Sequence, residues 1–265
     1  MRGMDLGLAG RVYILTGASR GLGFAAAECL VADGAHVVIA SRHADAVSAA
    51  ADRLTAEARD IGSTGTARAI AVNNAEPDAA ERLVTAALER GNRLDGALIS
   101  VGGPPAAPAT VVTDEQWRES FETVFLGAVR IARTVAARLA KHDGGTIVFV
   151  LSTSVRAPLP GLGVSNGLRP GLAAVAKEMS DEYGPRRVRV LSLLPGRIAT
   201  DRMRELTASA PDPEDAARAL AAEIPLRRLG DPTEFGRVAA FLLSPAASYL
   251  TGIAVPVDGG LLRTF

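Results

Sequence analysis

Residues 13–27, YILTGASRGLGFAAA, decide the fold of this chain. An apolar run comes first, Gly17, Gly21 and Gly23 follow it, and an alanine-rich run comes after them. Glycines between a strand and a helix allow a tight turn and a close approach of the backbone to a pyrophosphate, which the N-terminus of the helix attracts. A structural turn alone does not explain three glycines at once. The stretch therefore predicts a strand, a dinucleotide-binding loop and a helix.

The same order of elements repeats along the rest of the chain. Short runs that are apolar throughout alternate with alanine-rich segments of helix length, which is typical of parallel strands covered on both faces. We therefore predict an α/β fold of Rossmann type, with a doubly wound parallel sheet in a single domain over residues 1–265. The runs expected to form strands are RVYILTG (11–17), AHVVIAS (35–41), ARAIAVN (67–73), DGALISVGG (95–103), GTIVFVLS (145–152), VRVLSLLPG (188–196) and GIAVPVDGG (252–260).

One segment interrupts this alternation. Residues 197–230 follow directly after a predicted strand and contain Pro211, Pro213 and Pro225. We interpret this segment as a helical flap beside the substrate site and not as a second domain. A cleft for a small hydrophobic substrate is expected between this flap, around Met203, and the loops VGGPPAAP (101–108) and RAPLPGLG (156–163).

The composition excludes several classes of partner. The chain has 265 residues, 48% of them hydrophobic, with 29 basic and 29 acidic side chains, so we expect no nucleic acid and no anionic membrane as partners. It has no apolar run of the roughly 18 residues that span a membrane, no recognisable leader, and a single cysteine, Cys29. These features predict a cytoplasmic protein. Because no cluster of His, Cys or Asp has the spacing of metal ligands, we expect no metal.

The end of the second predicted strand bears on the choice of dinucleotide. A site that prefers NAD has an acidic residue there to hold the ribose 2′-hydroxyl, but Ala40, Ser41 and Arg42 occupy the place. Arg20 lies inside the glycine loop. Two guanidinium groups and a hydroxyl suit a 2′-phosphate, which favours NADP(H). The alternative, in which both arginines are ordinary surface residues, stays open.

Several motifs in the right order resemble the short-chain dehydrogenase/reductase family in its compact form. Thr16-Gly17-x-x-x-Gly21-x-Gly23, NRLDGALISVGG, LLPGRIAT and FLLSPAASYLTGIAVPVDGG carry this resemblance nearly from end to end. The resemblance implies that Asn73 and Asn74 meet the adenine. It also implies that the nicotinamide carboxamide and the diphosphate are held by Pro195, Gly196, Ile198 and Thr200. The cofactor-binding residues expected from the loop and the resemblance together are Gly17, Ser19, Arg20, Gly21, Leu22, Gly23, Ser41, Arg42, Asn73, Asn74, Gly102, Arg169, Pro195, Gly196, Ile198 and Thr200.

The departures from the family pattern fall on the catalytic side. The family's Asn-Asn-Ala-Gly is Ile-Ser-Val-Gly at 99–102, and its helix asparagine is Val124. The active-site serine is kept as Ser152. Thirteen positions later, where the family has Tyr-x-x-x-Lys, stand Ser165 and Arg169. Of the four usual catalytic side chains only the serine remains.

These substitutions leave two functions open. A serine is a far weaker acid than a tyrosine, and a guanidinium does not give up its proton, so ordinary ketones lose their proton donor. In the first function, Ser152, Ser165 and Arg169 are catalytic, and hydride passes to an acceptor that needs no tyrosine: a conjugated alkene, a quinone, an iminium or an activated ketone. In the second, the protein is a non-catalytic NADP(H)-binding module with a sensing or partner role. In the alternative without a functional role, Ser165 only fills space near the cofactor and Arg169 is a solvent-facing helix residue.

The last predicted strand bears on assembly. GIAVPVDGG places an apolar strand close to the C-terminus, where an uncovered sheet edge favours association. Proteins that this chain resembles commonly pair there as dimers of dimers. We therefore expect a homotetramer, with a homodimer as the alternative.

Overall fold

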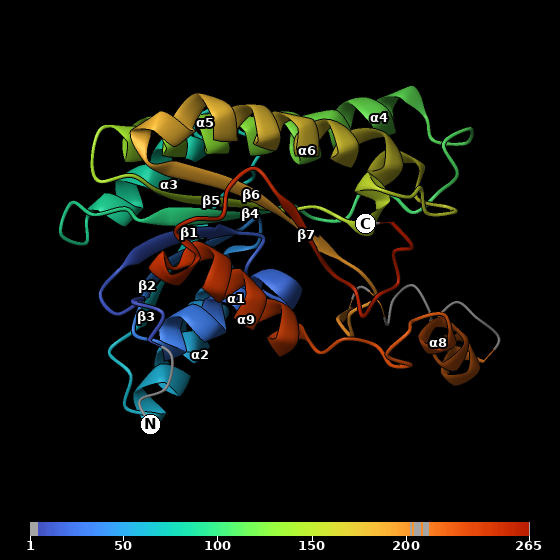
Figure 1. Cartoon of the computed structure of the whole chain (residues 1–265), viewed down its shortest axis with the longest axis horizontal. Coiled ribbons are helices and arrows are strands. Elements are labelled where there is room, and N and C mark those ends of the chain that lie inside the picture. Colours follow the sequence, from blue (N-terminus) through green and yellow to red (C-terminus); the bar gives the residue numbers. More distant parts are fainter. Residues whose placement is uncertain (1–4, 202, 204–207, 209–211, 265) are drawn as a thin grey trace.

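All seven apolar runs form strands, as the sequence predicts. A computed structural model describes residues 5–201, 203, 208 and 212–264 of the chain. Within this part the strands form one parallel sheet with the order β3-β2-β1-β4-β5-β6-β7 (Figure 1), which confirms the doubly wound Rossmann fold. The strands are β1 (Val12–Thr16), β2 (His36–Ser41), β3 (Thr66–Ala71), β4 (Gly96–Ser100), β5 (Gly145–Val150), β6 (Val188–Pro195) and β7 (Ala254–Val257).

Helices cover both faces of this sheet (Figure 1). One layer contains α3, α5 and α6, and the other contains α1, α2 and α9. The described helices are α1 (Gly21–Ala32), α2 (Ala44–Asp60), α3 (Ala79–Leu88), α4 (Asp114–Ser120), α5 (Gly127–Ala140), α6 (Gly163–Tyr183), α8 (Pro213–Ala222) and α9 (Pro232–Leu243), with a π-helical segment, Phe121–Leu126, between α4 and α5.

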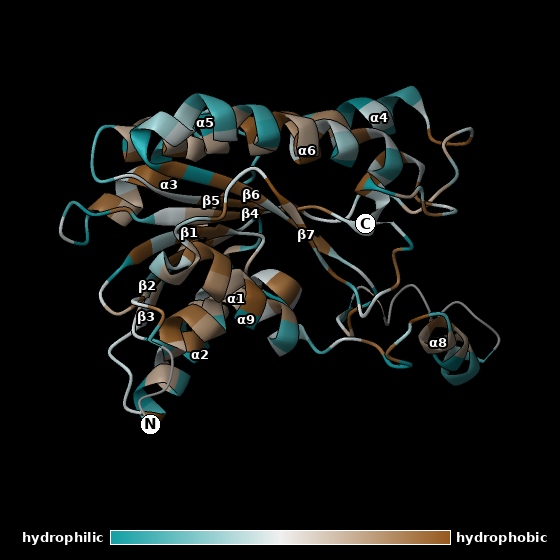
Figure 2. Ribbon diagram, viewed as in Figure 1, coloured by the Kyte–Doolittle hydropathy of each residue, from teal (hydrophilic) through white to brown (hydrophobic). Residues whose placement is uncertain are grey.

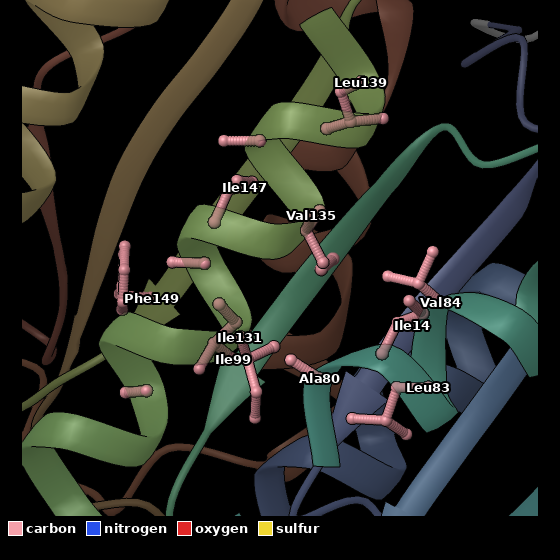
Figure 3. Packing of buried hydrophobic residues seen from close by; sticks show 14 of the residues in the cluster. Ile14, Ala80, Leu83, Val84, Ile99, Ile131, Val135, Leu139, Ile147 and Phe149 are labelled. Carbon is pink, nitrogen blue, oxygen red and sulfur yellow. The ribbon is translucent and has the colours of Figure 1, made fainter. Parts of the chain in front are cut away.

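Successive side chains along a strand point to opposite faces of the sheet, and so they pack into two separate hydrophobic cores. Ile14 of β1 lies in the core under α3 and α5, whereas its neighbours Tyr13 and Leu15 lie in the core under α1 and α9. Figure 3 shows the first core, where Ile131 of α5 packs near Phe149 of β5. Because both faces of the sheet are covered at its centre, the central strands β1, β4 and β5 are mostly apolar and buried, and much of the sheet is brown in Figure 2.

The sheet has its topological switch point at β1. The chain runs outward from β1 to β2 and β3, and then returns to add β4 on the other side of β1. Thr16 at the end of β1 and Ser100 at the end of β4 are joined twice, because the Thr16 hydroxyl donates to the Ser100 carbonyl at 2.6 Å and accepts from the Ser100 amide at 3.0 Å. Ligands of open α/β sheets bind in the crevice above such a point.

The segment interpreted as a flap, 197–230, begins and ends on one bridge, between Ile198 and Gly230. It contains α8, which Arg197 holds in place by donating to the carbonyl of Leu220 at 2.6 Å and by pairing with Glu223 at 2.6 Å. Residues 202, 204–207 and 209–211 of the predicted flap lie outside the described residues.

At the opposite end of the strands, Asp95 holds β1 and β4 together. Its carboxylate accepts from the backbone N–H of Val12 at 2.9 Å and pairs with Arg11 and Arg93, each at 2.6 Å. Burial alone would raise the pKa of Asp95, but the hydrogen bonds from Arg93 and Val12 and the charges of the two arginines outweigh it, and the pKa lies below its ordinary value. Folding is therefore coupled to ionisation of this carboxyl group.

We predict that Asp95→Asn lowers the free energy of unfolding by about 2 kcal/mol at pH 7, because charge-assisted hydrogen bonds are lost. Since the pKa of Asp95 is lower in the folded state, its stabilisation is present above the ordinary value of about 4 and is lost as the pH falls through the folded pKa. Urea unfolding of both proteins from pH 7 to pH 3 measures this. Asp143→Asn, at a fully exposed position, is the control. A difference that does not shrink below about pH 4 would contradict the assignment.

Candidate active site

The glycine loop brings three pieces of backbone together at the switch point. Gly17 and Gly21 have positive φ angles of 60° and 61°, a left-handed conformation that favours glycine. A Cβ on Gly17 would lie 2.9 Å from the carbonyl oxygen of Ser100, and one on Gly23 would lie 2.5 Å from that of Gly17. The side chain of Arg20 does not cap α1, so the first N–H groups of this helix remain to bind a ligand.

Two hollows meet at this loop. The larger, a cavity of about 590 Å³, extends from the glycine loop past the ends of β4, β5 and β6 to α8. The smaller, of about 200 Å³, extends toward the ends of β2 and β3. They share Gly17 and residues 100–104, so a dinucleotide with its pyrophosphate at the loop fits one nucleoside into each hollow.

Most of the cofactor-binding residues expected from the sequence border these hollows. Ser19 lies in the same loop and borders neither of them. The smaller hollow is lined by Ser41, Arg42, Asn73 and Asn74. The larger is lined by Arg20, Gly21, Leu22, Gly23, Arg169, Pro195, Gly196, Ile198 and Thr200, and both touch Gly17 and Gly102.

Arg169 is a buried charged residue that lines the larger cavity. It projects from α6 against the end of β5, where its Nη1 donates to the main-chain carbonyls of Val150 at 3.0 Å and Leu151 at 2.9 Å. Its Nε donates to the hydroxyl of Ser165, one turn earlier on α6, at 3.1 Å. The side chain is therefore fixed by three hydrogen bonds, and the surface interpretation of this residue is wrong.

The guanidinium of Arg169 is a buried cation without a carboxylate partner in the described residues. The residue is 7% exposed, and its contacts there are with neutral oxygens. Burial lowers the pKa of Arg169 to about 10, which leaves the group charged at neutral pH. The other charged side chains that border the cavity in this part of the chain are Arg20, Arg197 and Asp201.

Three serines follow one another by hydrogen bonds from this cation, Ser165 first, then Ser154 and Ser152. Ser165 is 6% exposed and borders the cavity, and its hydroxyl lies 3.3 Å from that of Ser154. Ser152, at the mouth of the same cavity, accepts from the backbone N–H of Ser154 at 3.1 Å. Since Ser165 accepts from Arg169, its own proton is free to be donated to Ser154 or into the cavity. No tyrosine borders the cavity within the described ranges.

The N-terminal half of α6 packs closely against the helices before β5. A Cβ on Gly167 would lie 2.9 Å from the ring of Trp117, and one on Gly171 would lie 2.9 Å from the ring of Phe125. Phe125 belongs to the π-helical segment, and so does Val124, which is buried and borders the smaller hollow. The place where the family has an asparagine is thus apolar here.

Sequence reasoning missed several residues of the site. Ser154 is found only through its contact with Ser165, and nothing in its spacing marks it. Asn166 clamps the loop before α6, because its side chain accepts from the N–H of Leu159 at 3.0 Å and donates to the carbonyl of the same residue at 2.8 Å. Leu159 lines the apolar end of the cavity, together with Pro160, Leu162, Met203, Leu220 and Leu261.

No helix among the described residues has the length and apolarity that a bilayer-spanning segment requires. No group of three or more His, Cys, Asp or Glu side chains in these ranges is placed to hold a metal ion.

The fold and the cleft at its switch point define a Rossmann-fold protein, and comparison with known proteins gives its family. Residues 17–262 match the family model described as Enoyl-(Acyl carrier protein) reductase. Dehydrogenase/reductase SDR family member 4 of Homo sapiens is 33% identical over 254 residues, which cover 96% of this chain and 88% of the relative. L-sorbose reductase from Gluconobacter frateurii, solved in complex with NADPH and L-sorbose, has 29% identity and a TM-score of 0.90, covering 99% of this chain and 100% of the other. The chain belongs to the short-chain dehydrogenase/reductase family.

Proposed function

We propose that this protein is an NADP(H)-dependent reductase that transfers hydride to a small hydrophobic acceptor, a conjugated or otherwise activated carbonyl, alkene or iminium compound, without a tyrosine acid. The observation that carries the proposal is the placement of Arg169, Ser165 and Ser152 in the cavity that begins at the glycine loop. A bound cofactor supplies the hydride. The apolar far end, with Leu159 and Leu220, suits a hydrophobic acceptor.

Several features support a dinucleotide with a 2′-phosphate. The glycine loop leaves no room for a Cβ at Gly17 or Gly23, and its helix N-terminus suits a pyrophosphate. Arg42 and Ser41 border the smaller hollow at the end of β2, and the acidic side chain among its described lining residues, Glu119, comes from α4 and not from β2. The related L-sorbose reductase was crystallised with NADPH. In our proposal Asn73 and Asn74 meet the adenine, and residues 195–200 hold the nicotinamide half.

The chain's own residues would position and stabilise rather than protonate. Losing a positioned acid costs about 10²–10⁴-fold in rate, and one well-aimed oxyanion donor restores about 10²–10³-fold. Arg169 is held rigidly by Val150 and Leu151, so it needs no reorganisation when negative charge develops beside it. The Nε of Arg169 also polarises the Ser165 hydroxyl, which makes that hydroxyl a better hydrogen-bond donor.

A second candidate is a non-catalytic NADP(H)-binding module. It is favoured by the lack of a tyrosine at the cavity and by the apolar Val124. The two candidates differ in one measurement. A binding module would bind NADPH but would not oxidise it, whichever acceptor is supplied. A reductase would oxidise NADPH in the presence of at least one activated acceptor.

We predict that Ser165→Ala lowers turnover by less than about tenfold, because only a weak hydrogen bond is lost. Arg169→Met should lower kcat/KM by about 100-fold or more, since both the charge and the oxyanion donors disappear. NADPH oxidation with an accepted substrate measures both effects, with cofactor binding followed by calorimetry. A thousandfold loss in Ser165→Ala with intact cofactor binding would show that the serine is itself an activated catalytic group, against this proposal.

The choice of cofactor gives a separate prediction. NADPH should bind more tightly than NADH, and Arg42→Asp should reverse or abolish this preference, because a carboxylate repels the 2′-phosphate and accepts from a free 2′-hydroxyl. Titration calorimetry with both cofactors on both proteins checks it. Arg59→Asp, on α2 and away from both hollows, is the matched charge control. Equal or tighter binding of NADH by the unaltered protein would refute the assignment.

We also propose a homotetramer, with a homodimer as the alternative. β7 lies at the edge of the sheet, and the side chains of Tyr249 and Ile253 before it are exposed. An edge with exposed apolar side chains is stabilised when a second copy covers it. Light scattering at micromolar concentration should give the mass of four chains or of two. The mass of a single chain would count against both forms.

A further inference from the structure

The hydrogen bonds of Arg169 leave part of its guanidinium free to bind a ligand. A guanidinium has five N–H groups. One, on Nε, goes to Ser165, and the two on Nη1 go to Val150 and Leu151. Nη2 makes no hydrogen bond with any residue in the described ranges, and Arg169 borders the cavity. Two donors and an unpaired positive charge thus remain for whatever the cavity binds.

This charge discriminates among the acceptors that need no tyrosine. Ribose hydroxyls of a cofactor are neutral, so they occupy a donor without compensating the charge. A cationic iminium acceptor would meet the buried guanidinium as a like charge, which disfavours its binding. An acceptor that becomes negative as hydride arrives gains attraction from the same group. The buried cation therefore favours anion-forming acceptors over cationic ones.

We propose that Nη2 of Arg169, with the hydroxyls of Ser165 and Ser152, forms an oxyanion site for conjugated carbonyl acceptors. The acceptors meant are those whose hydride adducts are resonance-stabilised oxyanions of low basicity, namely phenolates or 1,3-dicarbonyl enolates. This inference rests on the proposed reductase function and narrows it, because it excludes iminium compounds and simple ketones. Adducts of this kind are weak bases, so the missing tyrosine is no loss for them.

The electrons and atoms balance without a protein acid. The acceptor carbon gains a C–H bond from the nicotinamide hydride and its electron pair, and the reduced cofactor becomes NADP⁺. The π electrons of the conjugated system move onto the carbonyl oxygen, which carries the negative charge beside Arg169. Water later protonates this oxyanion, so that one proton from solvent is consumed in each turnover.

Binding of 4-nitrophenol tests the site without any turnover, because phenol and phenolate differ in visible absorption. We expect the protein, alone and with NADP⁺, to bind the phenolate at least tenfold more tightly than the phenol, which lowers the pKa of the bound ligand. Arg169→Gln should abolish this preference, and Arg169→Lys should keep part of it. Equal binding of phenol and phenolate by the unaltered protein would overturn the inference, whether or not the variants fold.

Arg189 offers a matched control. It is half-buried, its partial burial lowers its pKa to about 10, and it donates to the carbonyls of Leu250 and Ser244 and to the hydroxyl of Thr146. However, Arg189 is not among the described residues that border the cavity. Arg189→Gln should therefore leave the phenolate preference unchanged. If it removed the preference as Arg169→Gln does, the effect would be one of general stability and the site would be refuted.

Turnover of three acceptors separates failure of this inference from failure of the proposed function. NADPH oxidation is followed with 2-benzylidene-1,3-indanedione, with N-methyl-3,4-dihydroisoquinolinium and with cyclohexanone, each corrected for the rate without protein. We expect the first to be reduced at least 100-fold faster than the other two. If the iminium or the ketone is reduced as fast as the indanedione, the proposed reductase function is supported and the oxyanion site is refuted. If none is reduced although NADPH binds, the reductase itself is refuted.

Discussion

The close approach of backbone at Gly17 is the constraint on which the rest of the molecule depends. The turn after β1 must lie against the carbonyl of Ser100 and beneath the first turn of α1, and only residues without a Cβ fit there at Gly17 and Gly23. Thr16 completes the junction through its two hydrogen bonds with Ser100. This contact fixes β1, β4 and α1 relative to one another, and both hollows open from it. A larger residue at either glycine would therefore disturb the sheet and the ligand site together.

The electrostatics of the larger cavity depend on the guanidinium of Arg169, which folding removes from water. Removing a guanidinium from water is unfavourable by several kcal/mol unless hydrogen bonds replace its hydration. Here the main-chain carbonyls of Val150 and Leu151, at the end of β5, accept two hydrogen bonds from Arg169. Ser165, one helical turn earlier on α6, accepts the third. These neutral partners satisfy three of the five donors but do not neutralise the charge, so Arg169 stays a cation without a carboxylate partner in the described part of the chain.

The sequence predicted the sheet well because its signals are local. Each strand is an apolar run, and the glycine loop lies where a strand passes into a helix. Most of the expected cofactor-binding residues border the two hollows for the same reason, since they follow strand ends that meet at one edge of the sheet. The two main-chain partners of Arg169 could not be predicted, because they are carbonyl oxygens 18 and 19 positions away and any side chain can stand on that backbone. The contact of Ser154 with Ser165 and the π-helical Phe121–Leu126 depend on packing between elements, which no periodicity records.

The use of main-chain anchors has a consequence for how such a cavity arises. A relative with the same strand presents the same two oxygens, whatever its side chains at the positions of Val150 and Leu151. An arginine grafted at the position of Arg169 would find its anchors already in place, provided that the residue at the position of Ser165 is small enough to leave it room. Two side chains one helical turn apart would thus be enough to replace a tyrosine proton donor and a lysine by a serine and a fixed guanidinium. Two substitutions of this kind leave the fold unchanged.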